Sequence, residues 1–372
     1  MAQLILLALL ALGVLLWLNA RKKAAARREE TGTPDETTPG GAEAAAALGL
    51  LPAEQLDTSR AAPANPHDEE IRTKVRSGDW QAGADYLAGA GRNWRERYRR
   101  LGVLQSEAEE DDSWLLVWRA ERPGDADAAL VHADALIGVA GNIRGALQAK
   151  YTTQEQFAGF HRVMAQAREA CHEAQALADA DDPCPYAMEI ACALSLGYGH
   201  DDFRALWAEV EKRGPHLVSA HVSALQYWCR KWRGSHELAE EFARRAAAKG
   251  SPGQLLSLLP LYAAFEQETA EEEADPETFY KAPELIAAAD ACLADLAAAV
   301  AANPAEPWIV QVRHLLAWTL YWQDRYEEAL EQFRAVDGYI DSAPWTYAGD
   351  PLQRYVDVRD YCALQVQEAA GT

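Results

Sequence analysis

Apolar residues recur at spacings of three and four along most of the chain, which is the pattern of amphipathic helices. Residues 220–250 show it most fully, with one stripe through Leu225, Trp228 and Trp232 and a second through Leu238, Ala239, Phe242, Ala243 and Ala246. Gly234 separates the stripes and suits a positive-φ helix end, and Ser235 can cap the next helix. The pattern predicts a helical hairpin. Such a hairpin cannot bury its apolar face alone, so it implies neighbours of the same kind.

The same periodicity continues on both sides of this hairpin. It predicts helices over residues 68–76, 79–90, 92–105, 114–122, 125–150, 153–180, 187–196, 202–213, 252–268, 283–302, 308–322, 326–339 and 351–367. Pro260 is expected to kink or divide one of them. Runs of Val, Ile, Thr and Tyr that would favour strands are nearly absent. We therefore predict an all-α fold of stacked antiparallel helical hairpins.

The first 20 residues have a different pattern, because no charge occurs from Leu4 to Leu18 and Trp17 lies near the end of the run. The run is just long enough to cross a bilayer core. Five basic residues follow between Arg21 and Arg28. By the positive-inside rule, residues 1–20 are predicted to be a single transmembrane anchor, with the N-terminus outside and the C-terminal domain cytoplasmic. A cleaved signal peptide is the alternative, although the segment lacks a basic n-region and a good cleavage site.

Composition divides the remainder of the chain. Residues 21–66 begin with the basic juxtamembrane cluster and continue rich in Ala, Thr, Pro, Gly and Glu, so a disordered linker is predicted there. Residues 67–265 are predicted to form a helical-repeat domain. Residues 266–282 are acidic and are interpreted as an exposed loop, and residues 283–372 form a C-terminal helical block.

The net charge of the chain indicates which classes of partner it could bind. The net charge is −22, from 35 basic and 57 acidic residues. An acidic surface argues against nucleic-acid binding, which needs clustered Lys and Arg. One basic run, Arg92–Arg100, could bind an anionic partner or the membrane surface. We favour the interpretation that it is a solvated face paired with nearby acids, namely Glu107, Glu109, Glu110, Asp111 and Asp112.

No motif in the sequence predicts catalysis. There is no Walker loop, no G-x-G-x-x-G after a strand, no G-x-S-x-G and no H-E-x-x-H, since His236-Glu237 lacks a second histidine. Cys184, Cys192 and His200 have no zinc spacing. The six cysteines contain no C-x-x-C pair, and reduced thiols on apolar helix faces are favoured, although disulfides are compatible with an even count. We predict no catalytic residue, no cofactor-binding residue, no metal ligand and no cofactor.

Tryptophans are unusually frequent, with twelve in the chain. Six of them form pairs four residues apart, namely Trp114 and Trp118, Trp228 and Trp232, and Trp318 and Trp322. Such pairs could line a ligand groove. Because every pair falls within a hydrophobic stripe, we interpret them as fillers between alanine-rich helices.

The C-terminal hairpin resembles a tetratricopeptide repeat. Ala317 in its first helix and Tyr326, Ala329 and Phe333 in its second match the repeat's small and aromatic positions, whereas Val336 and Asp341 depart from its usual Ala and Pro. The central hairpin is similar through Gly234, Ala239 and Ala246, but Ala243 replaces the large aromatic. The resemblance implies a tetratricopeptide-like α-solenoid.

Residues 79–265 also resemble an uncharacterised bacterial domain of unknown function. The matching features are Trp118 with Pro123, Arg144-Gly145, Pro183-Cys184-Pro185 and the Lys231-Trp-Arg-Gly-Ser235 turn, in which Arg233 stands where that family usually has Gly. This resemblance implies a helical array and brings no activity with it.

These observations predict a membrane-anchored scaffold for protein–protein interaction rather than an enzyme. Its partner is expected to be a protein or peptide, and a basic one by electrostatic complementarity. The lipid bilayer is contacted through residues 1–20, and no nucleic acid is bound. Two alternatives remain at this stage: an enzyme with a site between the helical blocks, and an extracytoplasmic binding protein with a cleaved signal peptide and paired cysteines.

Overall fold

The computed structural model describes residues 40–145, 152–271, 274–336 and 338–371. In these ranges the protein is all-α, as predicted: seventeen α-helices and no strand occur, apart from one isolated bridge between Asp57 and Tyr339. The predicted anchor, residues 1–20, and the part of the predicted linker before residue 40 lie outside the described residues. The described chain forms two compact units, and the division falls between Ala239 and Glu240.

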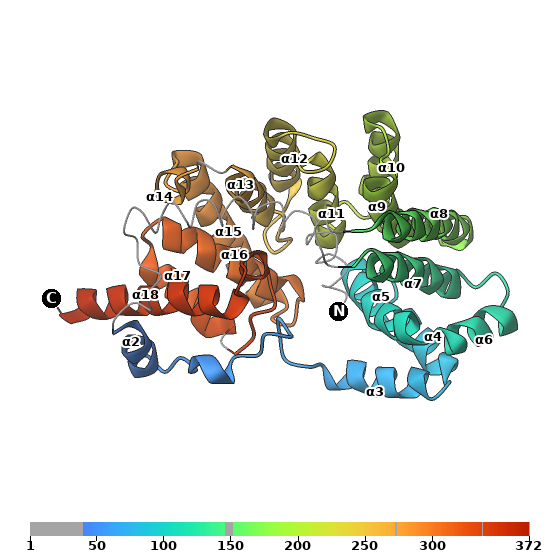
Figure 1. The fold of residues 1–372 in the computed structure, drawn as a ribbon, viewed down its shortest axis with the longest axis horizontal. Coiled ribbons are helices and arrows are strands. Elements are labelled where there is room, and N and C mark those ends of the chain that lie inside the picture. The colour runs from blue at the N-terminus through green and yellow to red at the C-terminus, as the bar shows by residue number, and fades with distance from the viewer. Residues whose placement is uncertain (1–39, 146–151, 272–273, 337, 372) are drawn as a thin grey trace. The chain divides into compact units, whose positions relative to one another are not determined.

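Unit 1 contains Ala64–Ala239. Its helices are α3 (Pro66–Arg76), α4 (Trp80–Ala88), α5 (Trp94–Glu110), α6 (Ser113–Glu121), α7 (Ala126–Arg144), α8 (Gln154–Leu177), α9 (Cys184–Leu196), α10 (His200–Arg213), α11 (Val218–Trp228) and the start of α12 (His236–Lys249). Helix α7 packs against both α5 and α8, and α9 packs against α8, α10 and α11 (Figure 1). Consecutive helices are therefore also spatial neighbours.

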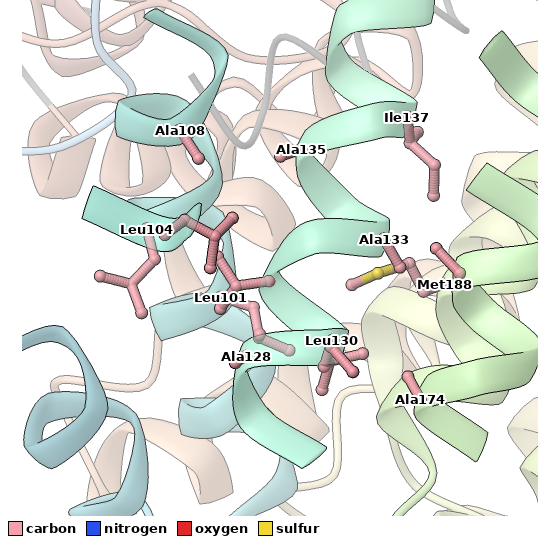
Figure 2. Close-up of a cluster of buried hydrophobic side chains, with 14 of the residues drawn as sticks. Leu101, Leu104, Ala108, Ala128, Leu130, Ala133, Ala135, Ile137, Ala174 and Met188 are labelled. Carbon is pink, nitrogen blue, oxygen red and sulfur yellow. The ribbon is translucent and has the colours of Figure 1, made fainter. Parts of the chain in front are cut away.

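The core of unit 1 lies along α7. Leu101, Leu104 and Ala108 of α5 lie on one side of this helix, and Met188 of α9 lies on the other, beside Ala133 (Figure 2). The alanines of α7 allow the neighbouring helices to approach closely, and each fully buried leucine contributes about 2 kcal/mol to stability. Leu130, Ala133 and Ile137 of α7 are buried in this core.

Unit 2 contains residues 40–63 and 240–371 of the described chain. Its elements are α2 (Gly41–Ala47), the 3₁₀ turn η1 (Ala53–Gln55), most of α12, α13 (Leu258–Ala270), α14 (Pro276–Phe279), α15 (Pro283–Ala302), α16 (Trp308–Trp322), α17 (Tyr326–Val336), the 3₁₀ turn η3 (Trp345–Tyr347) and α18 (Pro351–Gly371). Helix α16 packs against α15 and α17, and α18 packs against α17 and α2.

The linker prediction is wrong for residues 40–66. Ala44 and Ala45 of α2 are buried with Leu330 and Ala363 in a small apolar cluster. Downstream, the backbone N–H of Asp57 donates to the carbonyl of Gly338 at 2.8 Å. The composition of this stretch gave no sign of order because its partners lie almost 300 residues away in sequence. Small side chains suffice here, since α18 supplies the other half of the packed surface.

The acidic segment also differs from the prediction. Glu266–Ala270 form the last turns of α13 instead of a loop, and Glu266 and Glu268 are buried. The Tyr347 hydroxyl donates a hydrogen bond to Glu266 at 2.7 Å, which offsets the cost of burying that carboxylate. Pro260 neither kinks nor divides a helix, because α13 begins at Leu258 and places this proline in the first turn, where no backbone N–H is needed.

One helix in the described ranges, α15, is long and apolar enough to cross a membrane by length and composition. Ala289, Cys292, Leu296 and Ala299 of this helix are buried, and α15 packs against α13 and α16. This segment is not the predicted N-terminal anchor.

Candidate functional site

The residues that carry the sequence resemblance in unit 1 have clear structural roles. The indole N–H of Trp118 donates to Asp125 at 3.1 Å, and Asp125 also caps α7. Gly145 ends α7 at a φ of 73°, and the backbone N–H of Cys184 donates to the side chain of Asp182 at 2.8 Å. These positions hold helix ends in place. They do not form a shared ligand site.

The turn after α11 corrects one detail of the sequence interpretation. Gly234 is needed for a close approach and not for a positive φ, because a Cβ atom there would lie 1.8 Å from the carbonyl oxygen of Trp228. Ser235 accepts a hydrogen bond from the backbone N–H of Leu238 at 3.3 Å, as expected for an N-cap. Trp232 lies outside both helices, so only Trp228 of this pair is on a helix.

Four of the six paired tryptophans, namely Trp114, Trp118, Trp228 and Trp318, are buried, and Trp232 and Trp322 are partly buried. Trp118 is fully buried and stacks on Trp80 at 5.9 Å between ring centroids, and Trp114 stacks on Trp118 at 6.5 Å. Trp318 contacts Trp322 edge-on at 5.6 Å. These contacts agree with the interpretation of the pairs as fillers.

The basic run on α5 is engaged by acids from other helices. Arg97 is buried and pairs with Asp182 at 2.9 Å and with Asp127. Arg99 pairs with Asp68, which also accepts a hydrogen bond from Tyr86 at 2.6 Å. The sequence predicted a solvated face paired with Glu107, Glu109, Glu110, Asp111 and Asp112. The partners of Arg97 and Arg99 are instead Asp68 of α3, Asp127 of α7 and Asp182 in the turn before α9, together with Glu96 of α5 itself. Packing brings these arginines under neighbouring helices.

Glu107 belongs to the same group of inter-helix ion pairs. Its carboxylate is buried and accepts hydrogen bonds from Arg72 at 2.7 Å and from Arg76, both on α3. A buried carboxylate with two guanidinium partners stabilises the packing of α3 on α5. Both oxygens of the Glu107 carboxylate accept hydrogen bonds from these guanidinium groups.

A second buried carboxylate, Glu189 of α9, is likewise satisfied. It accepts from Gln175 at 2.6 Å and Tyr198 at 2.7 Å, and a ring nitrogen of His172 lies 3.2 Å away. Burial, together with the neighbouring Glu189 carboxylate, raises the pKa of the Tyr198 phenol above its ordinary value. These contacts stabilise the packing of α8 against α9.

The interface between α5 and α7 holds a polar cluster that is not satisfied. Gln105 and Glu109 lie one turn apart on α5, and Asp134, Gly138 and Asn142 lie one turn apart on α7. We call these five residues the α5–α7 polar seam. Figure 2 shows the two helices side by side, with Leu104 and Ala108 of α5 facing α7.

Gly138 allows the side chains from α5 to lie against the backbone of α7. A Cβ atom at this position would lie 1.4 Å from Oε1 of Glu109 and 2.3 Å from Nε2 of Gln105. Both polar groups of α5 therefore meet over Gly138. A larger residue at position 138 would displace them.

Three polar atoms of the seam are buried without a hydrogen-bond partner. They are Oε1 and Nε2 of Gln105 and Oε1 of Glu109, and Gln105 is only 1% exposed. Asn142 donates to the other oxygen of Glu109 at 3.2 Å. Each unmade hydrogen bond of a buried group costs about 1–3 kcal/mol. An unsatisfied group of this kind calls for a ligand or for ordered water.

The carboxyl groups of the seam are shifted toward the protonated form. Burial, and then the nearby charge of Glu109, raises the pKa of Asp134 to about 7. Burial also raises the pKa of Glu109. No lysine or arginine of the described ranges lies close enough to lower the pKa of either carboxyl group.

This shift predicts that Asp134→Asn stabilises the protein above neutral pH. Unfolded Asp134 ionises near 3.8 and the folded residue near 7, so the wild type loses stability as pH rises between these values. The advantage of the variant should be near zero at pH 4 and about 2 kcal/mol at pH 8, allowing for partial exposure. Urea unfolding at both pH values measures it. Asp179→Asn, on an exposed residue, is the control, and an equal effect there would contradict the prediction.

Sequence reasoning did not find the seam. The apolar stripe of the predicted helix 125–150 runs through Ala129, Ala133, Leu136, Ala140, Ile143 and Leu147, and it leaves out Asp134 and Gly138. The available signal was Gly138, a glycine inside an otherwise unbroken helical pattern, which often marks a place where another helix packs closely. The pattern does not show which helix that is.

The described residues contain no group of three or more His, Cys, Asp or Glu side chains placed to hold a metal ion. Comparison with family models, curated proteins and solved structures gives no match for this chain. The function is therefore argued from the geometry.

Proposed function

We propose that this protein is a membrane-anchored helical-repeat scaffold that binds a partner protein. The observation that supports the proposal most directly is the order of packing. Helices α7 to α10 follow one another in sequence and pack each on the next, with α11 against α9. Stacked helical pairs of this kind are built to present extended surfaces to protein partners.

The α16–α17 hairpin supports a tetratricopeptide-like repeat. Ala317 lies buried on α16, and Ala329 and Phe333 lie buried on α17, at the positions where the repeat uses small and aromatic residues. Packing of α17 against both α16 and α18 is consistent with α18 acting as a terminal cap. We propose that the helices of each unit are stacked in the same tetratricopeptide-like way.

Reduced cysteines favour the cytoplasmic form of the scaffold over the extracytoplasmic alternative. All six cysteines are buried, and none of them forms a disulfide. Disulfides are typical of secreted proteins, whereas thiols persist in reducing compartments. The anchor at residues 1–20 and the basic residues that follow it give the same orientation by the positive-inside rule.

Topology is the first test of this proposal, and Ser251→Cys makes it practical. Ser251 is exposed, whereas the native cysteines are buried and should react only after unfolding. A membrane-impermeant maleimide should label the variant only after the cells are permeabilised, and the intact mass should include residues 1–20. The wild-type protein measures background labelling. Labelling in intact cells, or loss of the first 20 residues, would contradict a cytoplasmic scaffold.

A further inference from the structure

We propose that the α5–α7 polar seam binds the cationic side-chain group, ammonium or guanidinium, of a basic partner segment. The proposal rests on the proposed scaffold function and names the chemistry that one of its surfaces recognises. Three observations support it: unsatisfied acceptors, an excess of negative charge, and access from the surface.

The seam offers two buried acceptors without a partner, Oε1 of Gln105 and Oε1 of Glu109. Oε1 of Glu109 lies over the bare backbone of Gly138, and the Gln105 amide lies there through its Nε2. The carboxyl group of Asp134 lies one turn before Gly138 on the same face of α7. An ammonium group carries three donors and a guanidinium carries five, so either can satisfy several of these oxygens at once.

The charge of the seam selects a cation over a neutral or anionic group. Glu109 and Asp134 are close enough for the charge of the first to raise the pKa of the second. No lysine or arginine of the described ranges contributes to the pKa shift of either carboxyl group. A cation from a partner would supply the missing charge and favour ionisation of both carboxyl groups. A metal ion is a poorer fit, because the described residues lack a cluster of three strong ligands.

The seam can be reached from solvent at one end. Asn142 is exposed and Glu109 is partly exposed, whereas Gln105 is closed off beneath them. A long, flexible side chain with a charge at its tip can enter such a site while its backbone stays at the surface. Lysine and arginine have this shape, and the acidic surface of the whole chain would attract a segment that carries them.

The test uses the full-length protein in a non-ionic detergent and N-acetyl-lysine methylamide as the probe. Ligand-observed saturation-transfer NMR should show saturable binding, and the Nε-acetylated form of the probe should not bind. Glu109→Gln should weaken binding about tenfold or more, because it removes one charged acceptor of the cation. N-acetyl-arginine methylamide distinguishes guanidinium from ammonium preference.

Glu110→Gln is the matched control, since it makes the same charge change at the next residue, which is exposed. The control should bind the probe within about twofold of the wild type. Equal weakening by both variants would show attraction by overall charge only and would overturn the proposal. Absence of saturable binding to the wild type would overturn it as well. Circular dichroism shows that each variant is folded.

A cross-linking experiment separates this proposal from the scaffold function. Wild type and Glu109→Gln are each cross-linked in the membrane and their protein partners are compared. If the wild type captures specific partners and Glu109→Gln captures them equally well, the scaffold function stands and the seam proposal fails. If the wild type binds the lysine probe but cross-links to no protein, the seam stands and the scaffold function fails.

Discussion

His314→Asn should abolish most of an acid-induced loss of stability that the wild-type protein shows between pH 6.5 and pH 3. His314 lies on α16 and is fully buried. Its Nδ1 accepts a hydrogen bond from the indole N–H of Trp345 at 2.9 Å. The ring is therefore neutral, with its proton on Nε2, which has no hydrogen-bond partner. Protonation of Nδ1 would place its N–H opposite the indole N–H of Trp345, and two donors would then face each other without an acceptor.

The sign of the effect follows from the pKa. Burial lowers the pKa of His314 from 6.5 to about 3, while the unfolded residue keeps its ordinary value. Below pH 6.5 His314 binds a proton in the unfolded chain but not in the folded protein. The free energy of unfolding therefore falls. The loss should reach about 2 kcal/mol at pH 5 and about 4 kcal/mol at pH 3.

Urea unfolding followed by near-ultraviolet circular dichroism at pH 7, 5 and 4 measures this loss. Asparagine retains an acceptor for Trp345 but does not titrate, so the variant should lose less stability than the wild type as pH falls. His161→Asn, at an exposed histidine, is the control and should follow the wild type. If His314→Asn and wild type lose stability in parallel, the buried neutral imidazole is not the cause.

Gly234→Ala should destabilise unit 1 by about 3 kcal/mol. The added methyl group would lie 1.8 Å from the Trp228 carbonyl oxygen and 2.3 Å from its carbon. Both are backbone atoms at the end of α11, so no side-chain rotation can relieve the overlap. The turn would have to open, and such overpacking typically costs 1–3 kcal/mol or more.

A second glycine provides the matched comparison. Gly199, before α10, has a φ of −67°, which alanine adopts freely, and a Cβ there would approach no atom closer than 3.6 Å. Gly199→Ala should cost about 0.5 kcal/mol, the usual penalty for alanine at an N-cap. Thermal unfolding of both variants measures the difference. Equal stability of the two variants would show that the turn relaxes without cost.

Helix caps depend on residues only three positions apart. Ser235 caps α12 as predicted, and Thr153, for which no prediction was made, caps α8 through a reciprocal pair with Gln156. Arg97 was predicted to be solvated, yet it pairs with an acid 85 residues away. Periodicity shows which face of a helix is apolar. It does not show which neighbour covers the other faces.

The candidate site illustrates the same limit. Glu109 was predicted to pair with the basic run Arg92–Arg100, and the sequence pattern assigned no role to Gln105 or Gly138. Their significance comes from the approach of α5 to α7, which buries an amide and a carboxylate against bare backbone. No local spacing within either helix encodes that juxtaposition.

The sequence by itself determined the all-α class, the positions of most helices and their buried stripes, because these depend on contacts within a few residues. Tertiary structure alone decided that residues 40–66 are ordered and that Glu266 is buried. It also brought the arginines of α5 to acids of other helices and left one polar seam unsatisfied. Each of these depends on partners distant in sequence, whose approach is set by the packing of whole helices.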